Sequence, residues 1–525
     1  MRGRLLCLFL LAFALRAPHI FGPLRWEERD LVPGLRDISL SPSACYVPPK
    51  VGDHTPLSVL AAWPLYRVAP HSAWVLRIPS LLAGSLIPVL LAWAVGRRVT
   101  PLAGLMAGLM AVSNNFLVTW SAYFMQEMLF LLFALLGLIA LIQAEQRQSP
   151  ALMLVAAVLC ALSFWTHEFA LLLVPLAGVW LVTSARSRQW LRTPGPWGGV
   201  LLWGALILPY FVWNYAQRDR FAAFGGMSIA QQHVAATILA RRALNARFVT
   251  FFVGGGLTDL LRGWPRLELN HVEPLAGAAL LLSAGACLVL KRRDPVVRLC
   301  LVVFWGVLLL FSFIDLEFRI YRFSLCILPG CALGGIVLAR AWQAKRLPRL
   351  GVAVLLCYFL VTATGLMPYA AGAAHQGFRW WGKGVLFSER PLIDLAAGAQ
   401  RNRPASLVIM PAPFWDHAPL QAEYETGVRC LGGSRETIYS STFWMRPYAA
   451  SEARALRIIV SCQEDVSSWW DFVTREGYQA TLTRDDARFR GMQQDTVVSC
   501  PLFVIDAVSD APLPVQAFLD RIYLR

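Results

Sequence analysis

Long apolar stretches recur along most of this chain and constrain its fold more than any other feature. Of the 525 residues, 57% are hydrophobic and 15% are charged, whereas about a quarter are charged in ordinary soluble domains. A helix needs about 20 mostly apolar residues to cross a bilayer. We therefore expect an all-α polytopic membrane protein with about eleven transmembrane helices. The predicted segments are 4–20, 75–95, 100–118, 126–144, 151–165, 168–184, 198–215, 273–290, 298–314, 322–340 and 350–370.

The positive charges gather in every second loop between these segments. Loop 113–125 and the turn at Trp165 and Thr166 contain no Lys or Arg. This alternation is the positive-inside pattern, so the net charge of +16 reflects membrane orientation and not nucleic-acid binding. It predicts a cytoplasmic N-terminus. The compact chain without eukaryotic retention signals favours the inner membrane of a bacterial cell. The basic groups are Arg2 and Arg4; Arg97 and Arg98; Arg147; Arg186, Arg188 and Arg192; Lys291 to Arg293 with Arg298; and Arg340, Lys345, Arg346 and Arg349.

The first apolar segment has an alternative interpretation as a cleaved signal peptide, with Arg2 and Arg4 before an apolar core at 5–15. Both interpretations place residue 26 on the outer side of the membrane. With eleven spans the C-terminus lies there too, in the periplasm or outside the cell. We expect residues 1–374 to form the membrane module, with exported loops 21–74 and 216–272.

The composition changes near residue 375, and we expect 375–525 to form an exported α/β domain. Short β-rich runs at Ser406–Met410, Leu456–Ser461 and Leu502–Asp506 are separated by polar and helical stretches. Cys430, Cys462 and Cys500 lie in this region, where at most one pair of the three can form a disulfide.

Carboxylates follow the first apolar segment, in the run from Trp26 to Asp30 (Trp-Glu-Glu-Arg-Asp). Acids beside lipid are costly to keep and indicate chemistry or ion binding. Glu27 and Glu28 are adjacent, so a regular helix or strand cannot point both into one site. The alternative is a solvated interfacial turn with internal ion pairs.

Three further groups are candidates for a site on the outer side. Glu127 falls at the outer end of the fourth segment beside a neutral loop. His54, next to Asp53, is a candidate ligand for Zn²⁺ or Mn²⁺, although a lone exposed histidine is more often not a ligand. Glu168, after His167, is placed as an acid at a helix N-terminus, which the helix dipole favours for structural reasons alone.

Several pieces of the chain, in order, resemble the GT-C glycosyltransferases, which use polyprenyl-phosphate-linked sugars. The family usually has Asp-Glu where this chain has Glu27-Glu28, and this departure bears on metal preference and on the reach of the base. The resemblance covers 1–185 well and 300–345 loosely. The matching pieces are Leu15-Arg16; Trp26 to Glu28; Asp53 to Leu57; Leu76 to Gly84 with Gly96 to Arg98; Ser113 to Glu127 with Thr166 to Glu168; and Phe318 to Phe323.

The resemblance implies transfer of a sugar from a polyprenyl-phosphate donor to a glycan, lipid or protein acceptor on the outer side, with inversion. It assigns Glu27, Glu28 and Glu127 as candidate bases. A divalent metal (Mn, Mg or Zn) on Glu27 and His54 is a further candidate. Arginine binds phosphate oxygens in pairs, so the candidates for the lipid phosphate are Arg77, Arg319, Tyr321 and Arg322.

Two other functions remain open from the sequence. A transporter or flippase for a lipid-linked sugar would carry ionisable residues near the bilayer midplane, often within repeated halves, and we find no repeat. A catalytically inactive scaffold of the same fold is the third interpretation. Trp469-Trp470-Asp471 resembles the start of an acceptor-binding signature of oligosaccharyltransferases, but lacks its continuation and predicts packing inside the exported domain.

Overall fold

The computed structural model describes much of the chain, which forms two compact units. The first comprises Met1–Gly22, Asp53–Leu65 and Ala73–Ala371. The second comprises Pro23–Gly52, Tyr66–Ser72 and Gly372–Arg525. The described residues are 2–21, 28, 35, 57–69, 72–183, 185–218, 274–290, 294–313, 324–344, 346–364, 377–379, 386–388, 390–402, 407–411, 422, 428–432, 452–461, 465–490, 497–515, 517–518 and 521.

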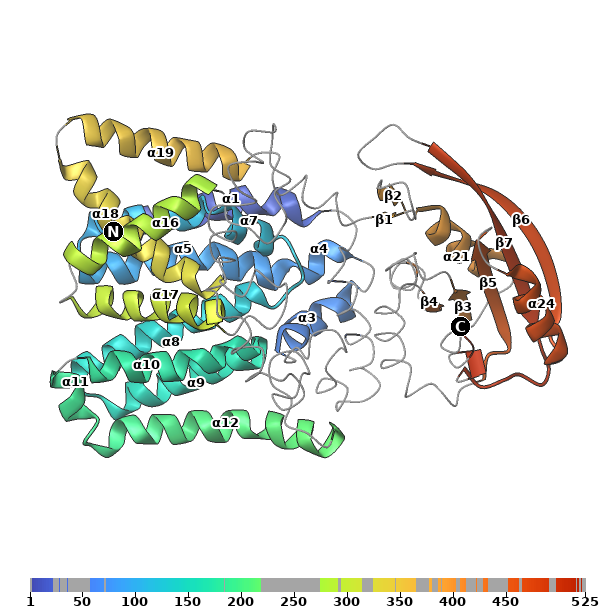
Figure 1. The fold of residues 1–525 in the computed structure, drawn as a ribbon, viewed down its shortest axis with the longest axis horizontal. Helices are drawn as coiled ribbons and strands as arrows, with labels where there is room; N and C mark the ends of the chain where they lie inside the picture. The colour runs from blue at the N-terminus through green and yellow to red at the C-terminus, as the bar shows by residue number, and fades with distance from the viewer. Residues whose placement is uncertain are drawn as a thin grey trace. The chain divides into compact units, whose positions relative to one another are not determined.

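Helices make up the first unit as far as it is described, and they run side by side as a bundle (Figure 1). Short loops join most of them, so neighbours in sequence run antiparallel. The helices are α1 (Arg2–Arg16), η1 (Ala17–Ile20), α3 (Leu57–Val68), α4 (Ala73–Leu76), α5 (Ile78–Arg98), α6 (Pro101–Val112), α7 (Asn115–Ser121), α8 (Glu127–Arg147), α9 (Pro150–Thr166), η3 (Glu168–Leu172), α10 (Leu173–Val182), α11 (Ala185–Trp190), α12 (Pro194–Arg218), α16 (Pro274–Leu290), α17 (Pro295–Phe313), α18 (Ile327–Gln343) and α19 (Arg346–Thr364).

In the described part of the chain, six helices are long and apolar enough to cross a membrane alone. The pair α6 and α7, bent by 57°, adds a seventh candidate, and four shorter apolar helices complete the set. Each of these overlaps one of the eleven segments predicted from the sequence. The prediction of an all-α polytopic membrane protein is confirmed, and the number of spans stays a prediction.

Capping residues set the helix boundaries on the side of the bundle where the loops are short. The side chains of Thr100 and Ser149 accept hydrogen bonds from the backbone N–H of Ala103 (3.1 Å) and Leu152 (3.4 Å). A proline follows each of these caps at the first helical position, where its missing N–H costs nothing. These turns therefore reverse the chain tightly.

Small residues let the helices approach closely, as is common between helices in lipid. At Gly104, a Cβ would collide with the backbone of Ala92 and Gly96 on α5. At Gly335 of α18, a Cβ would collide with the backbone of Ala107 on α6. The core helices α5, α6 and α18 are therefore in backbone contact.

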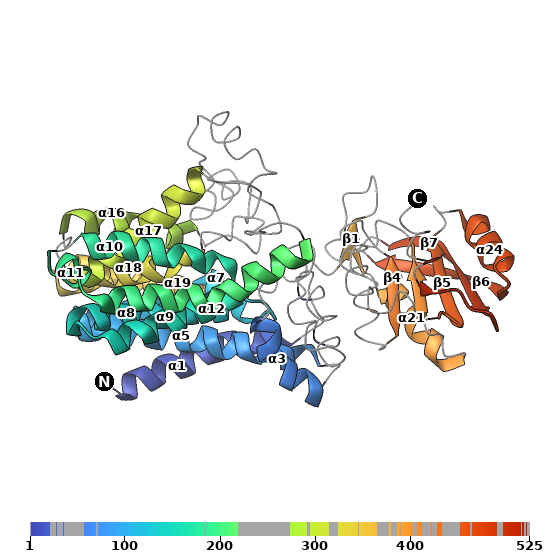
Figure 2. The ribbon, with the colours of Figure 1, turned by 90° about the horizontal axis from the view of Figure 1, so that it is seen from below.

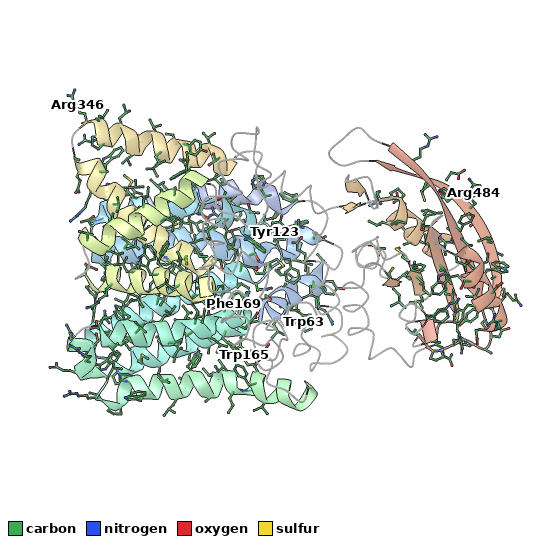
Figure 3. All side chains as sticks on the ribbon, viewed as in Figure 1. Trp63, Tyr123, Trp165, Phe169, Arg346 and Arg484 are labelled. Atoms are coloured by element: carbon green, nitrogen blue, oxygen red, sulfur yellow. The ribbon has the colours of Figure 1, made fainter. Side chains whose placement is uncertain are left out.

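Cations gather at one end of the bundle, which we call the basic end and define by residues 97–101, 145–150, 183–194, 294–298 and 343–349. There Arg186 Nη2 donates to the carbonyl oxygen of Gln146 (2.6 Å), and Arg298 donates to that of Thr183 (3.4 Å). Figure 3 shows Arg346 at this end and Tyr123, Trp165 and Phe169 at the opposite one. The alternating basic loops predicted from the sequence thus meet on one side.

The second unit contains a five-stranded mixed sheet of order β4-β3-β5-β7-β6 (Figure 2). β3 is parallel to β4 and β5, whereas β7 is antiparallel to β5 and β6. A two-stranded antiparallel pair, β1 and β2, precedes it. The elements are β1 (Gly377–Arg379), β2 (Leu386–Ser388), α21 (Arg390–Asn402), β3 (Leu407–Met410), β4 (Arg429–Gly432), β5 (Ala455–Ser461), α24 (Val466–Arg475), β6 (Gln479–Arg490) and β7 (Val497–Val508).

The side chains of the central strands alternate between two hydrophobic cores. Val408 and Met410 face the core that contains Leu392 and Ala396 of α21, while Leu407 and Ile409 belong to the core that contains α24. The period of two along a strand requires this separation. α21 and α24 therefore cover opposite faces of one sheet, which confirms the predicted α/β fold of this region.

These two cores contain tryptophan and cysteine residues for which the sequence made predictions. Trp469 is fully buried and Trp470 packs against the same core, as expected for a packing role of this motif. Cys430 and Cys500 are buried free thiols of the core that contains α21, and Cys462 lies outside the described residues.

Candidate functional site at the polar end of the bundle

Buried polar side chains gather at the end of the bundle opposite the basic end, which we call the polar end. It is formed by the end of α1, the start of α5, all of α7, the start of α8 and the junction of α9 with η3. The buried polar residues there are Arg16, Arg77, Ser80, Ser113, Asn114, Asn115, Thr119, Ser121, Gln126, Glu127, Ser163, Thr166, His167 and Glu168. Hydrocarbon cannot satisfy such groups, so their concentration at one end requires an explanation.

A break between α6 and α7 shapes this end. Asn114 caps α7 by accepting a hydrogen bond from Leu117 N–H (3.1 Å), and the chain turns by 57° between the two helices. The break leaves the last carbonyl groups of α6 without helical partners. It also keeps α7 within the bundle, where all of its residues are buried.

Arg16, at the end of α1, supplies the missing donors. Its guanidinium is fully buried and donates to the carbonyl oxygens of Ala111 (3.2 Å) and Val112 (3.3 Å) at the end of α6. Its Nε–H donates to Ser121 Oγ on α7 (3.2 Å). A cation is favourable at the negative end of a helix dipole. Arg16 therefore fixes α6 and α7 relative to α1.

The segment that follows α7 leads directly into Glu127. Ser80 Oγ of α5 donates to the carbonyl oxygen of Met125 (3.1 Å), and the rings of Trp120 and Tyr123 lie 5.8 Å apart. Glu127 is the first residue of α8 and is 1% exposed. This position lies at the positive end of the helix dipole. A buried carboxylate is thus held at the predicted outer end of the fourth segment.

The hairpin of α8 and α9 brings His167 and Glu168 to the same end. Ser163 Oγ on α9 donates to the carbonyl oxygen of Phe130 on α8 (3.0 Å), and the rings of Phe130 and His167 lie 5.3 Å apart. Phe130 is one turn from Glu127. The two acidic positions that the sequence separates by about forty residues therefore share one end of this hairpin.

His167 lies between α9 and η3, and its side chain contacts both of the residues that follow it. Its Nδ1 accepts a hydrogen bond from Phe169 N–H (3.3 Å) and lies 3.5 Å from Glu168 Oε2. These contacts place the imidazole of His167 and the carboxyl group of Glu168 side by side at the start of η3. Glu168 begins a helix, as predicted, and is buried.

Arg77 occupies a different place from the one expected. As a ligand for the lipid phosphate it was expected at the exposed rim of a span. The side chain is fully buried, and Nη1 donates to the carbonyl oxygen of Ile20 (2.6 Å) at the end of η1. It therefore ties the end of α1 and η1 to the start of α5, and its role toward phosphate stays a prediction.

Glu28, in the second compact unit, is fully buried. A solvated interfacial turn would expose this side chain, so burial argues against that interpretation for Glu28. The other predicted residues of the site, Glu27, His54, Arg319, Tyr321 and Arg322, lie outside the described residues, as do the loop 216–272 except its first three positions and most of the loop 21–74.

The predicted metal ligands Glu27 and His54 are among the residues that the structure does not describe. Within the described ranges, no group of three or more His, Cys, Asp and Glu side chains is arranged to hold a metal ion. The metal therefore stays a prediction that concerns the first loop.

Residues 53–213 match the family model described as dolichyl-phosphate-mannose-protein mannosyltransferase. No curated protein matches the sequence significantly.

Solved structures share the fold over most of this chain. ArnT from Cupriavidus metallidurans in the apo state is 13% identical, with a TM-score of 0.59 over 98% of this chain and 99% of that one. The same protein bound to undecaprenyl phosphate gives a TM-score of 0.60 with the same identity and coverage. The Archaeoglobus fulgidus oligosaccharyltransferase in complex with Zn and sulfate gives 0.55 at 13% identity, over 90% of this chain and 69% of that one.

These matches confirm the resemblance to the GT-C superfamily. The chain is a multi-pass membrane protein with the fold of the GT-C glycosyltransferases. Among the buried Arg, His and Glu side chains named at the polar end, Arg16 is the one that the sequence analysis did not propose for the site. The available signal was an arginine directly after an apolar helix, which resembled an ordinary residue at the membrane interface.

Proposed function

We propose that this protein transfers a sugar from a polyprenyl-phosphate-linked donor to an acceptor on the outer side of the cytoplasmic membrane. The observation that carries the proposal is the buried carboxylate of Glu127 at the start of α8, within a fold shared with a protein solved with undecaprenyl phosphate. A glycosyltransferase is also what the family match over 53–213 supports.

The chemistry that we assign is a displacement at the anomeric carbon. A carboxylate takes the proton of the acceptor hydroxyl while its oxygen forms a bond to the anomeric carbon. The bond from that carbon to the phosphate oxygen breaks, and polyprenyl phosphate leaves with the electron pair. Attack opposite to the leaving group inverts the anomeric configuration.

Two sets of residues are assigned to these roles. Glu28 is our first candidate for the base, with Glu27 as an orienting partner and Glu127 as a second acid. Arg319, Arg322, Tyr321 and Arg77 are the candidates that neutralise the leaving phosphate, because guanidinium groups match phosphate oxygens in geometry and charge. A divalent metal held by Glu27 and His54 would supply further charge to the same phosphate.

The positions of the buried acids bear on the transporter alternative. Glu127 and Glu168 begin their helices at the polar end, and Glu145 lies in the last turn of α8 at the other end. A transporter would be expected to place ionisable groups near the bilayer midplane, within broken helices. These three described acids are at helix ends, which favours the transferase.

The test is sugar transfer from a labelled undecaprenyl-phosphate sugar pool in membranes that contain the wild type, Glu27→Gln or Glu28→Gln at matched expression. We expect turnover by the wild type and a loss of about 10²–10⁴-fold in Glu28→Gln, the range for removal of a general base. Equal product from all three would remove the first loop from the mechanism. Retention of the lipid without turnover by any of them would favour the transporter or scaffold.

A further inference from the structure

An apolar groove opens on the side of the bundle near the basic end, away from the proposed site. Its volume is about 170 Å³, and it lies between α8, α9, α10 and α12. Leu138 of α8, Met153 and Cys160 of α9, and Gly178 of α10 are among its lining residues. Protein interiors rarely leave spaces of this size. An apolar cavity of about 150 Å³ takes up a molecule as large as benzene.

The groove is open to the surroundings of the helices, not sealed within them. Trp197 and Val200, which line it on α12, are 56% and 37% exposed. A Cβ added at Gly178 on α10 would meet no atom within 4 Å. The exposed faces of both helices are apolar, so a hydrocarbon chain can enter from the side.

The groove extends from the basic end to about the middle of the bundle. Leu191 lines it at the basic end, and Leu138 on α8 and Cys160 on α9 line it near the middle of these helices. On α10 the lining runs from Leu173 to Leu181, which is most of that helix. The groove is therefore continuous with the loops that the positive-inside pattern assigns to the cytoplasmic side.

An arginine-rich segment stands at the mouth of this groove. Leu191, which lines the groove, accepts a hydrogen bond at its carbonyl oxygen from Trp197 Nε1 (2.8 Å). The neighbouring Arg188 and Arg192 are exposed. The segment is fixed in place because Ser187 Oγ donates to Glu145 Oε1 (2.9 Å) on α8. The carboxylate of Glu145 is buried, so it does not lie on the exposed surface that carries Arg188 and Arg192.

We propose that the groove and the arginine segment together bind one anionic phospholipid of the cytoplasmic leaflet. One acyl chain lies in the groove, and the phosphate contacts Arg188 and Arg192. The chemistry of the two parts matches such a lipid, since the lining is apolar and guanidinium groups bind phosphate oxygens. The inference does not depend on the proposed transferase activity.

The test is a titration of the purified full chain with dioleoyl phosphatidylglycerol, dioleoyl phosphatidylcholine or undecaprenyl phosphate, followed by native mass spectrometry. Gly178→Phe fills the groove, and Gly178→Leu does so with a smaller side chain in case the first variant folds poorly. Arg188→Gln with Arg192→Gln removes the charge. Gly204→Phe is the matched control on α12, because Gly204 also has open space but does not line the groove. Arg346→Gln with Arg349→Gln controls for exposed charge on another loop of the basic end.

We expect the wild type to bind phosphatidylglycerol on the order of tenfold more tightly than phosphatidylcholine, since each arginine near an anionic head group contributes about 1 kcal/mol. Gly178→Phe or Gly178→Leu weakens both lipids, the Arg188 and Arg192 variant weakens phosphatidylglycerol alone, and both controls match the wild type.

Three results would overturn the proposal. The first is wild-type binding by both Gly178 variants. The second is an equal loss of phosphatidylglycerol binding in the variant at Arg188 and Arg192 and in the control at Arg346 and Arg349. That result would leave Arg188 and Arg192 a role in membrane orientation alone. The third is preferential binding of undecaprenyl phosphate that Gly178→Phe abolishes, which would assign the groove to the donor lipid.

Discussion

The two ends of the helical bundle both bury a carboxylate of the same helix, but in different surroundings. At the basic end, Glu145 accepts a hydrogen bond from Ser187 Oγ (2.9 Å), and exposed arginines surround the helix ends. At the polar end, Glu127 begins α8 among fully buried polar groups, and loop 113–125 carries no Lys or Arg. The basic end carries exposed cations that join neighbouring segments, whereas the arginine and carboxylate groups described at the polar end are buried in the fold.

The arginine side chains at the two ends also differ in burial and in their hydrogen-bond partners. Arg98 and Arg186 at the basic end have exposed side chains, and both bond to Gln146 in the last turn of α8. Arg16 at the polar end is fully buried and bonds to the ends of α6 and to α7. A buried guanidinium is costly, so its retention there indicates a structure that must be held in one arrangement.

The largest expected effect concerns which end faces the cytoplasm. Single cysteines are introduced as Phe21→Cys near the polar end and Leu347→Cys at the basic end, both at exposed positions. A membrane-impermeant maleimide added to intact cells should label Phe21→Cys and leave Leu347→Cys unlabelled, because arginine-rich loops stay in the cytoplasm.

Detergent-solubilised samples of both variants, which should label alike, control for reactivity, and the unsubstituted chain gives the background from its native cysteines. The opposite labelling pattern in cells would reverse the orientation of the bundle and place the polar end in the cytoplasm.

The next effect concerns the buried arginine of the polar end. Arg16→Gln removes charged donors from Ser121 and from the carbonyl groups of Ala111 and Val112, and we expect a stability loss of about 2–3 kcal/mol. The thermal midpoint in detergent measures it. Arg4→Gln, at an exposed position of the same helix, should leave the midpoint unchanged. Equal midpoints for the two variants would mean that Arg16 does not hold the break between α6 and α7.

A partly buried ion pair in the sheet unit is a reference for charge with a purely structural role. Arg457 on β5 donates to both carboxylate oxygens of Asp506 on β7 (2.6 and 2.7 Å) and to the carbonyl oxygen of Leu395 on α21 (2.8 Å). Asp506→Asn should destabilise this unit by about 2 kcal/mol, measured by urea unfolding of the full chain.

The exposed pair of Arg484 and Asp486 is the matched control, since surface pairs contribute less than about 1 kcal/mol. If Asp486→Asn cost as much as Asp506→Asn, burial would not be what distinguishes the two pairs.

The smallest expected effect depends on pH. Tyr478 Oη donates to the carbonyl oxygen of Ala453 (2.8 Å) and accepts from Leu513 N–H (2.9 Å). Burial raises the pKa of this phenol above its ordinary value, and the nearby Glu476 raises it further. The neutral form is therefore favoured in the fold. The stability that the neutral phenol contributes is complete below its pKa in the unfolded chain, about 10. It is lost as the pH rises through the higher pKa of the phenol in the folded protein.

Tyr478→Phe should cost about 1 kcal/mol at pH 8, because two buried backbone groups lose their partner. The stability difference between wild type and variant should shrink above pH 10, as measured by urea unfolding at several pH values. A difference that stays constant up to pH 11 would show that the phenol does not ionise there.

Hydropathy predicted the fold well because a backbone that crosses lipid must satisfy its own hydrogen bonds, as a helix does. Each predicted segment overlaps an apolar helix, and Glu127 falls where it was expected, at the start of one. The β-rich runs of the last region likewise became β3, β5 and part of β7. In all these cases the pattern of apolar residues determines the element.

The break in the third segment was not predicted, although 100–118 contains its signal. Ser113 and Asn114 are polar residues inside an apolar run, and Asn114 caps a new helix there. Arg16 and Arg77 were harder to place, because their partners are backbone carbonyl groups of distant helices. No side chain in the sequence marks such acceptors, and only packing brings them within reach.

The comparison of the two ends is tested most directly on α8 itself, by sugar transfer from a labelled undecaprenyl-phosphate sugar in membranes that contain Glu127→Gln or Glu145→Gln at equal expression. Both substitutions remove one buried carboxylate from the same helix. If the polar end performs the chemistry, Glu127→Gln loses turnover by about 10²–10⁴-fold while Glu145→Gln keeps it. Equal turnover by the two variants, or a loss confined to Glu145→Gln, would contradict that account.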